Sequence, residues 1–253
     1  MAARIQLRGR SCCFVEGPRR PARSPHRDLT VRVLAAPSRK VHVVTTHLEL
    51  LWIPLGADGS TVVRGCGRLY ERIHALMQRR SPCALLHAAL RVCTESGTTY
   101  AIEVGPAWGN SDPDRGVVRT GPVGARCLSS LAFFRYEVRC WRGGTIPDAD
   151  AAVPGPVEVA TDPTRTSLLL ARATEVPGLV WGRVAPGTTE MWNSNSVVSW
   201  LLTSSGHELP ELPELPAGAR APGWCAGVQL AVPVPEGPGR SGPTALSRWT
   251  NQA

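Results

Sequence analysis

The sequence predicts an α+β domain in which a small antiparallel sheet packs against two or three helices. Segments 41–53, 83–104 and 133–141 are rich in β-branched residues or alternate between apolar and polar residues, as strands do. Other segments carry apolar residues at helical spacing. Hydrophobic residues make up 43% of the chain, enough for a real core. The nucleotide-binding pattern G-x-x-x-x-G-K-[ST] does not occur in it, and the one G-x-G-x-x-G match, at residues 237–242, lies in the tail that we expect to be disordered.

The first strand spans residues 41–53 and ends at Pro54, and the short segment 61–63 is expected to pair back on it. Residues 83–94 and 99–104 form a hairpin around a turn at 95–98. His87 and Glu103 are polar members of these otherwise apolar strands, and burial of such groups is costly unless they have partners. Further strands are predicted at 133–141 and 224–232, separated from the hairpin by a loop over 105–115.

Three helices are expected. Apolar residues at helical spacing predict the first over residues 69–80, with Leu69, Ile73, Leu76 and Met77 on its apolar face. Asp162 and Pro163 open a second helix that runs to residue 173, with the aspartate as N-cap. The third follows the polar residues after Trp192 and ends at Gly206. Residues 208–216 repeat Glu-Leu-Pro and predict an extended connector.

The net charge of +8 is concentrated at the amino end of the chain. Residues 1–46 carry ten basic and two acidic residues, which leaves 18 of each for the remainder. We therefore predict a disordered basic arm at 1–40, a single domain at 41–232 and a disordered tail at 233–253. Nucleic-acid binding is not favoured, although an arm that binds a polyanion is an alternative to a solvated leader.

No segment has the pattern of a signal peptide or the length of a membrane span, so a cytoplasmic protein is expected. The eight cysteines form no C-x-x-C pair and have no histidine at ligand spacing. Neither a metal site nor a cofactor is predicted.

The candidate site is the start of the third helix, where short polar side chains are concentrated. We expect Ser194 to be a nucleophile, His87 its base and Glu103 the group that orients the base. The candidates for binding a small-molecule or peptide substrate are the residues around the serine, namely Trp192, Asn193, Asn195 and Ser196.

Structural roles are open alternatives for each of these residues. Ser194 and Asn193 suit helix capping, and Trp192 suits packing beside the helix start. His87 suits a core histidine bonded to a buried carboxylate such as Glu103, and His47 is an alternative base.

Two short segments resemble known families. Asn193-Ser194-Asn195-Ser196-Val197 resembles the N-C-N-H-F and N-C-E-H-F segments of the PPPDE-type peptidases and the lecithin retinol acyltransferase family. The strand at residues 86–92 resembles their H-x-G-x-x-V strand, which carries the base. The helix start is also similar to that of an uncharacterised bacterial family with an N-S-N-T-F-type segment. This second resemblance implies a fold but no known reaction.

The first resemblance implies a circularly permuted papain-like fold, as in NlpC-type proteins, and a hydrolase or acyl-transferring enzyme acting on an amide or ester. Ser194 stands where those families have a catalytic cysteine. A helix end contributes about 1 kcal/mol, far too little to ionise a serine hydroxyl, so Ser194 needs a general base. The alternative is a non-catalytic member of the fold that binds a peptide or an acyl group.

Overall fold

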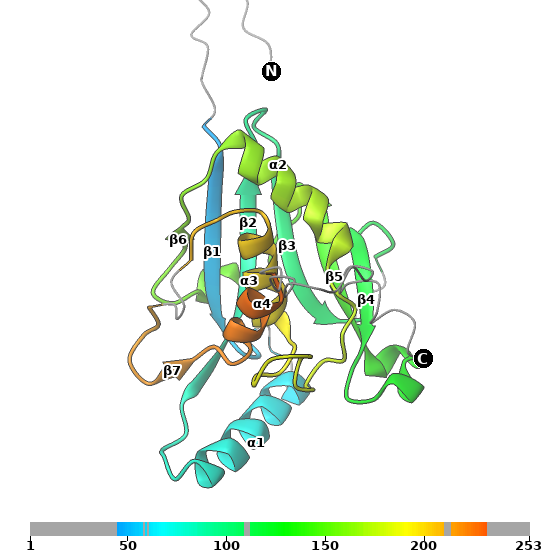
Figure 1. Cartoon of the computed structure of the whole chain (residues 1–253), viewed down its shortest axis with the longest axis vertical. Coiled ribbons are helices and arrows are strands. Elements are labelled where there is room, and N and C mark those ends of the chain that lie inside the picture. Colours follow the sequence, from blue (N-terminus) through cyan, green and yellow to red (C-terminus); the bar gives the residue numbers. More distant parts are fainter. Residues whose placement is uncertain (1–44, 58, 60, 109–111, 210–213, 232–253) are drawn as a thin grey trace, which may run out of the picture. The chain divides into compact units, whose positions relative to one another are not determined.

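The computed structural model describes residues 45–57, 59, 61–108, 112–209 and 214–231. The predicted arm at 1–40 and tail at 233–253 lie outside these residues. The α+β class is confirmed (Figure 1). The elements are β1 (His47–Pro54), α1 (Thr61–Met77), β2 (Ala84–Cys93), β3 (Thr99–Pro106), β4 (Val117–Pro122), β5 (Arg135–Arg142), β6 (Val157–Glu158), α2 (Pro163–Arg172), α3 (Ser194–Ser204), β7 (Ala219–Arg220) and α4 (Trp224–Ala231).

The strands form one sheet in the order β4-β5-β3-β2-β1-β6, with antiparallel pairing throughout, and β7 pairs parallel with β2. The predicted hairpin is confirmed as β2 and β3, with Leu90 opposite Ile102. Helices α2, α3 and α4 lie over one face of the sheet (Figure 1). The main apolar core, which includes Trp52, Leu90 and Leu201, lies between these helices and the strands.

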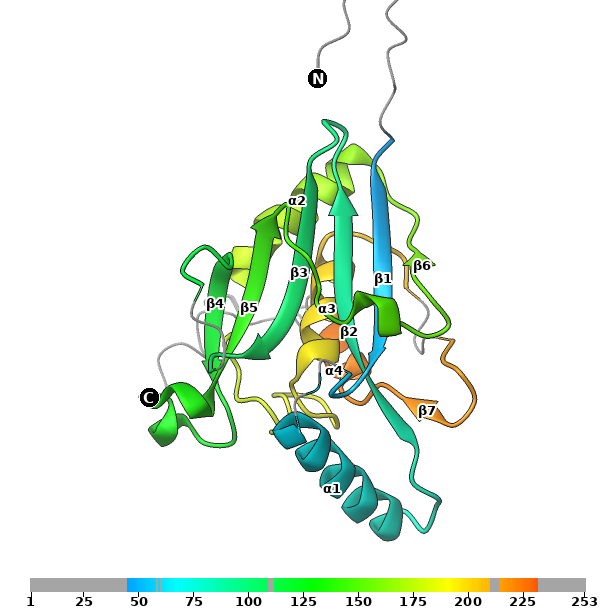
Figure 2. The ribbon, with the colours of Figure 1, turned by 180° about the vertical axis from the view of Figure 1, so that it is seen from behind.

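The opposite face of the sheet holds a smaller apolar cluster of Leu51, Ile53, Ala89, Ala101 and Ile146. The segment after β5 crosses this face, including the short 3-10 turn Ala149–Ala151 (η3) in front of β1 and β2 (Figure 2). Side chains alternate between the two faces of a strand, so His87, two residues before Ala89, belongs to this second face.

Helix α1 begins earlier than predicted, because residues 61–63 form its first turn and do not pair with β1 as a strand. Its predicted packing face is also wrong. Leu69 and Leu76 are 61% and 80% exposed, whereas Gly67, Glu71 and Ala75 are buried. The helix packs through its small residues because these permit a close approach: a Cβ on Gly67 would lie 2.3 Å from Leu55 Cδ2.

Residues 224–231 form α4 instead of the predicted last strand. A short apolar run fits a buried helix as well as a strand, and the tertiary contacts decide between them. Here α4 packs on α3 so closely that a Cβ on Gly227 would lie 2.0 Å from the Ser196 carbonyl oxygen. The Ser199 hydroxyl donates to the Trp224 carbonyl at 2.7 Å and joins the two helices.

Strand β4 was not predicted either, and it pairs with β5 through a register shift between Val117 and Arg119. The second helix follows its prediction. Asp162 caps α2 by accepting a hydrogen bond from the Arg165 N–H at 2.9 Å, and Pro163 is its first residue. Part of the predicted connector, residues 210–213, lies outside the described residues.

Candidate functional site

The first turn of α3 is held by a capping box in which Asn193 and Ser196 are the partners. Asn193 Oδ1 accepts hydrogen bonds from the N–H groups of Asn195 at 2.9 Å and Ser196 at 3.3 Å. In return, the Asn193 N–H donates to Ser196 Oγ at 3.1 Å. Ser194 is the first residue of the helix, and its hydroxyl takes no part in this cap. Of the two residues expected to suit capping, Asn193 is the one that caps.

Asn195 ties the helix start to the sheet at the point where β2 and β3 separate. The two strands pair only between residues 90–93 of β2 and 99–102 of β3. The Leu85 carbonyl accepts from Leu55 N on the side of β1, so the Leu86 carbonyl faces the side of β3. Asn195 Nδ2 donates to that Leu86 carbonyl at 3.1 Å and to the Pro222 carbonyl at 2.9 Å. Figure 2 shows the first turn of α3 in the opening between β2 and β3.

His87 is paired with a carboxylate that the sequence did not single out. Its Nε2 lies 3.4 Å from Asp148 Oδ2, and both residues are buried. Asp148 belongs to the segment that crosses the second face of the sheet, the face on which His87 lies. The pair joins positions 61 residues apart in the chain. A carboxylate beside an imidazole fixes the orientation of the ring.

A cavity of about 380 Å³ brings the predicted catalytic residues together. His87, Glu103, Asp148 and Ser194 all line it. It lies at the end of the sheet where β1 and β3 end and β2 begins. Much of the remaining wall is apolar or aromatic and comes from α1, from β5 and from the loops on the opposite side: Val62, Cys66, Tyr70, Trp108, Phe133, Tyr136, Trp181 and Met191.

The predicted binding residues divide into two groups. Asn193 and Asn195 line the cavity, although both use their side chains to hold the backbone around it. Ser196 and Trp192 are fully buried and do not line it. Ser196 completes the helix cap, and Trp192 packs in the core with its Nε1 donating to the Tyr136 hydroxyl at 3.1 Å. We therefore assign these two residues structural roles in place of ligand binding.

The predicted nucleophile and base are not hydrogen-bonded to each other in the part of the chain that the structure describes. Within the described part of the chain, the Ser194 hydroxyl forms no hydrogen bond with His87, whose ring bonds to Asp148. Catalytic hydrogen bonds are often long before substrate binds and shorten in the complex, so this arrangement is compatible with catalysis. It is also what a non-catalytic cavity would have.

Tyrosines in the cavity wall stay neutral near physiological pH. Burial raises the pKa of Tyr136 to about 12, and the hydrogen bond from Trp192 only partly offsets this. The Tyr136 hydroxyl itself donates to the Leu179 carbonyl at 2.9 Å. Burial likewise raises the pKa of Tyr70. Both phenols are therefore neutral near physiological pH.

His47, the alternative base, lies elsewhere. It does not line the cavity and is bonded to Glu49 at 3.0 Å, with Glu158 at 3.4 Å. The hydrogen bond that the ring donates to the Glu49 carboxylate is the main cause of the raised pKa of His47. The structure supports no role for His47 beside Ser194.

Asp148 is the site residue that sequence reasoning missed. It lies in the loop sequence Gly-Gly-Thr-Ile-Pro-Asp-Ala-Asp, where aspartate is an ordinary loop residue. No local signal links it to His87, because the contact depends on how the loop folds across the sheet. In the described residues no group of three or more His, Cys, Asp or Glu side chains is placed to hold a metal ion.

Comparison of the chain with models of protein families, with curated proteins and with solved structures finds no match. The described residues include no helix with the length and apolar character to cross a membrane. The fold and the cavity therefore define the class of the molecule: an α+β protein with a serine at a buried helix start and a His–Asp pair in the same cavity.

Proposed function

We propose that this protein is a hydrolase or acyl-transferring enzyme that acts on an amide or ester, with Ser194 as nucleophile and His87 as general base. The observation that carries the proposal is the shared cavity. Ser194 and the His87–Asp148 pair line the same cavity of about 380 Å³. Buried serine, histidine and aspartate in one concave site are the parts of a nucleophile–base–orienter arrangement.

In the proposed reaction, His87 takes the proton from Ser194 Oγ as this oxygen bonds to the substrate carbonyl carbon. The protonated imidazole is stabilised by Asp148 and then gives the proton to the leaving amine or alkoxide when the bond to the carbonyl carbon breaks. Water, or an acceptor alcohol or amine, repeats the sequence and releases the acyl group from Ser194. The positive end of α3 favours the negative charge that develops on the carbonyl oxygen.

Asp148 replaces Glu103 as our first choice for the group that orients His87, because its carboxylate is at 3.4 Å from the ring. Glu103 lines the same cavity, and its predicted role stays a prediction. The apolar and aromatic wall favours a substrate whose acyl group or side chain is apolar. The order of base and nucleophile, a strand histidine followed by a helix-start serine, also supports the permuted papain-like fold as part of the proposal.

Labelling with a fluorophosphonate probe tests the nucleophile. The probe should label the wild-type protein, and Ser194→Ala and His87→Ala should lose the label. Ser204→Ala is the matched control, because Ser204 lies in the last turn of the same helix and, among the described residues, its hydroxyl bonds only to the Leu201 carbonyl. Circular dichroism melting checks that each variant folds. Labelling that persists in Ser194→Ala would contradict the assignment.

A second candidate function, binding without catalysis, is favoured by one observation: the Ser194 hydroxyl and His87 are not hydrogen-bonded in the described part of the chain. In that case the cavity holds a peptide or acyl ligand through its apolar wall. A fluorescent fatty acid should then bind wild type and Ser194→Ala equally, and wild type should neither react with the probe nor release product from acyl esters. Labelling of wild type at Ser194 would exclude this alternative.

A further inference from the structure

Helix α1 presents three different faces around its axis. Successive residues advance by about 100° in an α-helix. The buried face is formed by Gly67, Glu71 and Ala75. Next to it comes an arginine row, Arg64, Arg68 and Arg72, and beyond that an apolar stripe, which we define as Val62, Leu69, Ile73, Leu76 and Met77. Every residue of the stripe is exposed.

The stripe is too large to be incidental. Single exposed apolar residues are ordinary on protein surfaces, whereas contiguous exposed patches mark interaction sites. Leu76 and Met77 are 80% and 74% exposed, and the stripe runs along the whole length of the 17-residue helix. Within the described residues nothing covers it. An occupant must therefore offer an apolar surface on the scale of a complete helix.

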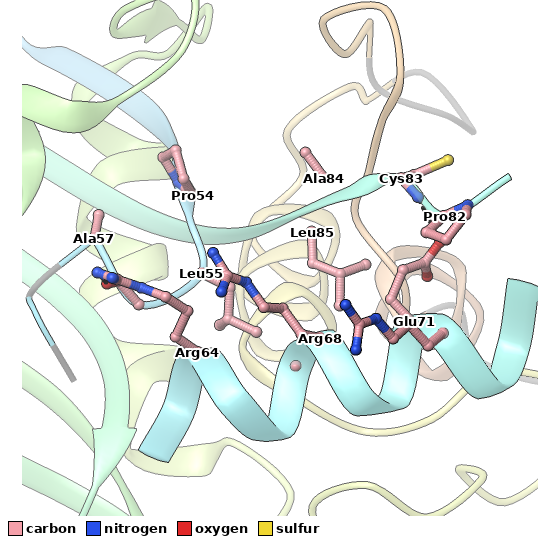
Figure 3. A pocket seen from close by; sticks show the side chains of 13 residues that line it. Pro54, Leu55, Ala57, Arg64, Arg68, Glu71, Pro82, Cys83, Ala84 and Leu85 are labelled. Carbon is pink, nitrogen blue, oxygen red and sulfur yellow. Dashed lines mark hydrogen bonds between the residues drawn. The ribbon is translucent and has the colours of Figure 1, made fainter. Parts of the chain in front are cut away.

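The arginine row borders a second hollow of the surface, a groove of about 490 Å³ between α1, residues 54–57 and the start of β2. Figure 3 shows Arg64 and Arg68 on the side of α1 that faces this groove. Arg64 donates to the Gly56 carbonyl, but Arg68 and Arg72 have no hydrogen-bond or ion-pair partner among the described residues. The acidic residue of the groove, Glu71, is already neutralised by Arg80 and Arg220. The groove is therefore suited to an anion.

We propose that α1 docks the protein on an anionic phospholipid surface. The apolar stripe enters the boundary between headgroups and acyl chains, and the arginine row binds the lipid phosphates and other anionic headgroup atoms. An amphipathic helix with an apolar face beside a row of basic residues is the arrangement that binds such surfaces. The apolar stripe and the arginine row occur on one helix. A surface of anionic lipids offers acyl chains to the stripe and phosphates to the arginines.

Other occupants fit less well. A symmetric dimer through this face would bring together two arginine rows, and the helix has no unpaired acidic residue to oppose them. Residues 1–40 carry ten basic and two acidic residues, so charge opposes docking of this segment beside the arginines. A nucleic acid would contact the arginines but leave the stripe unused.

The stripe also borders the candidate site. Val62 of the stripe lines the cavity that contains Ser194, together with Cys66 from the next turn. Across the cavity, Trp108 stacks on Phe133 with ring centroids 5.5 Å apart, and Phe133 is exposed. A membrane bound along the stripe would hold lipids beside the entrance of the cavity. The docking itself does not depend on the proposed catalysis, so Ser194→Ala should leave it unchanged.

Vesicle flotation with the full-length protein tests the proposal. Vesicles of phosphatidylcholine mixed with phosphatidylserine should bind the protein, and vesicles of phosphatidylcholine alone should bind it less. Because residues 1–40 carry ten basic residues and should also attract anionic vesicles, matched variants are needed. Leu76→Asp on α1 should weaken binding at least about tenfold, because burial of one leucine side chain in the lipid raises the affinity by roughly this factor. Leu168→Asp, an exposed leucine on α2, makes the same chemical change and should have little effect.

The arginine row has its own matched pair. Arg68→Gln with Arg72→Gln should weaken binding to the mixed vesicles by about fivefold for each arginine. Arg119→Gln with Arg142→Gln removes the same charge from exposed positions on β4 and β5 and should weaken it much less. Equal effects within either pair would overturn the proposal, because binding would then depend on net charge or on the arm alone. A dimer that Leu76→Asp converts to a monomer, with vesicle binding unchanged, would also overturn it.

Discussion

Helices α3 and α1 both carry apolar residues at helical spacing, yet they meet their surroundings in opposite ways. Nine consecutive residues of α3, from Ser194 to Leu202, are buried, because the helix lies between the sheet and α4. Helix α1 buries only Gly67, Glu71 and Ala75 and turns its large apolar residues outward. Apolar spacing therefore predicts that a helix forms, but it does not establish which face packs. The neighbouring elements decide that.

This difference also separates the roles of the two helices. The polar start of α3 is fixed by hydrogen bonds from Asn193 and Asn195 to neighbouring backbone, which hold Ser194 at the cavity. The polar groups of α1 instead anchor the helix through Glu71 and leave its apolar stripe available to a partner. A buried polar group needs a hydrogen-bond partner, so a helix that carries such groups is stable only in the position where each of them has one.

The largest expected effect comes from one substitution made in both helices. Leu201 is fully buried in α3, so Leu201→Ala should lower the free energy of unfolding by about 2–5 kcal/mol through lost burial and a residual cavity. Leu76→Ala in α1 removes the same atoms from an exposed side chain and should change the free energy of unfolding by less than about 0.5 kcal/mol. Urea denaturation of both variants measures the difference. Similar losses would mean that the stripe of α1 is packed in solution.

Much of the sheet was predictable because strand alternation is a local property. The hairpin of β2 and β3 and the strand β5 follow directly from it. Helix α4 was not predictable, because an eight-residue apolar run fits either structure and only its contact with Ser196 and Ser199 decides. The packing face of α1 was missed because a close approach selects Gly67 and Ala75 over larger apolar residues.

The candidate site was predictable in part. Short polar residues before an apolar run marked the start of α3, and a lone histidine in an apolar strand marked His87. The cavity contains both. Asp148 could not be found in this way, because its partner lies 61 residues earlier and the loop between β5 and β6 carries no pattern that fixes its path.

Substitution of alanine for two helical glycines should change the stability by an intermediate amount, with opposite signs in α4 and α1. In α4, Gly227→Ala would place a Cβ 2.0 Å from the Ser196 carbonyl oxygen, a backbone atom of α3, and should destabilise the protein by about 1–3 kcal/mol. In α1, Gly65→Ala meets no atom within 4 Å and should stabilise it by up to about 1 kcal/mol through helix propensity. Thermal unfolding of the two variants gives the signs. A neutral Gly227→Ala would mean that α3 and α4 separate readily.

The smallest expected effect concerns the anchor of α1 and depends on pH. Burial pushes the pKa of the Glu71 carboxyl up, but hydrogen bonds from Arg80 and the Cys83 N–H, with the charges of Arg80 and Arg220, outweigh it and hold this pKa below its usual value. A carboxyl whose pKa is lower in the folded than in the unfolded state stabilises the protein above the unfolded pKa of about 4.3. That stabilisation is lost as the pH falls through the folded pKa.

Glu71→Gln should therefore cost about 1 kcal/mol at pH 7, where the charge-assisted hydrogen bonds are lost, and progressively less as the pH falls below about 4. Arg80→Gln should reduce the same pH-dependent component, because it removes the partner that lowers the Glu71 pKa most strongly. Denaturation at pH 7 and at acid pH measures both. If wild type and Glu71→Gln lose stability in parallel on acidification, the ion pair does not anchor α1, and the helix is held by Gly67 and Ala75 alone.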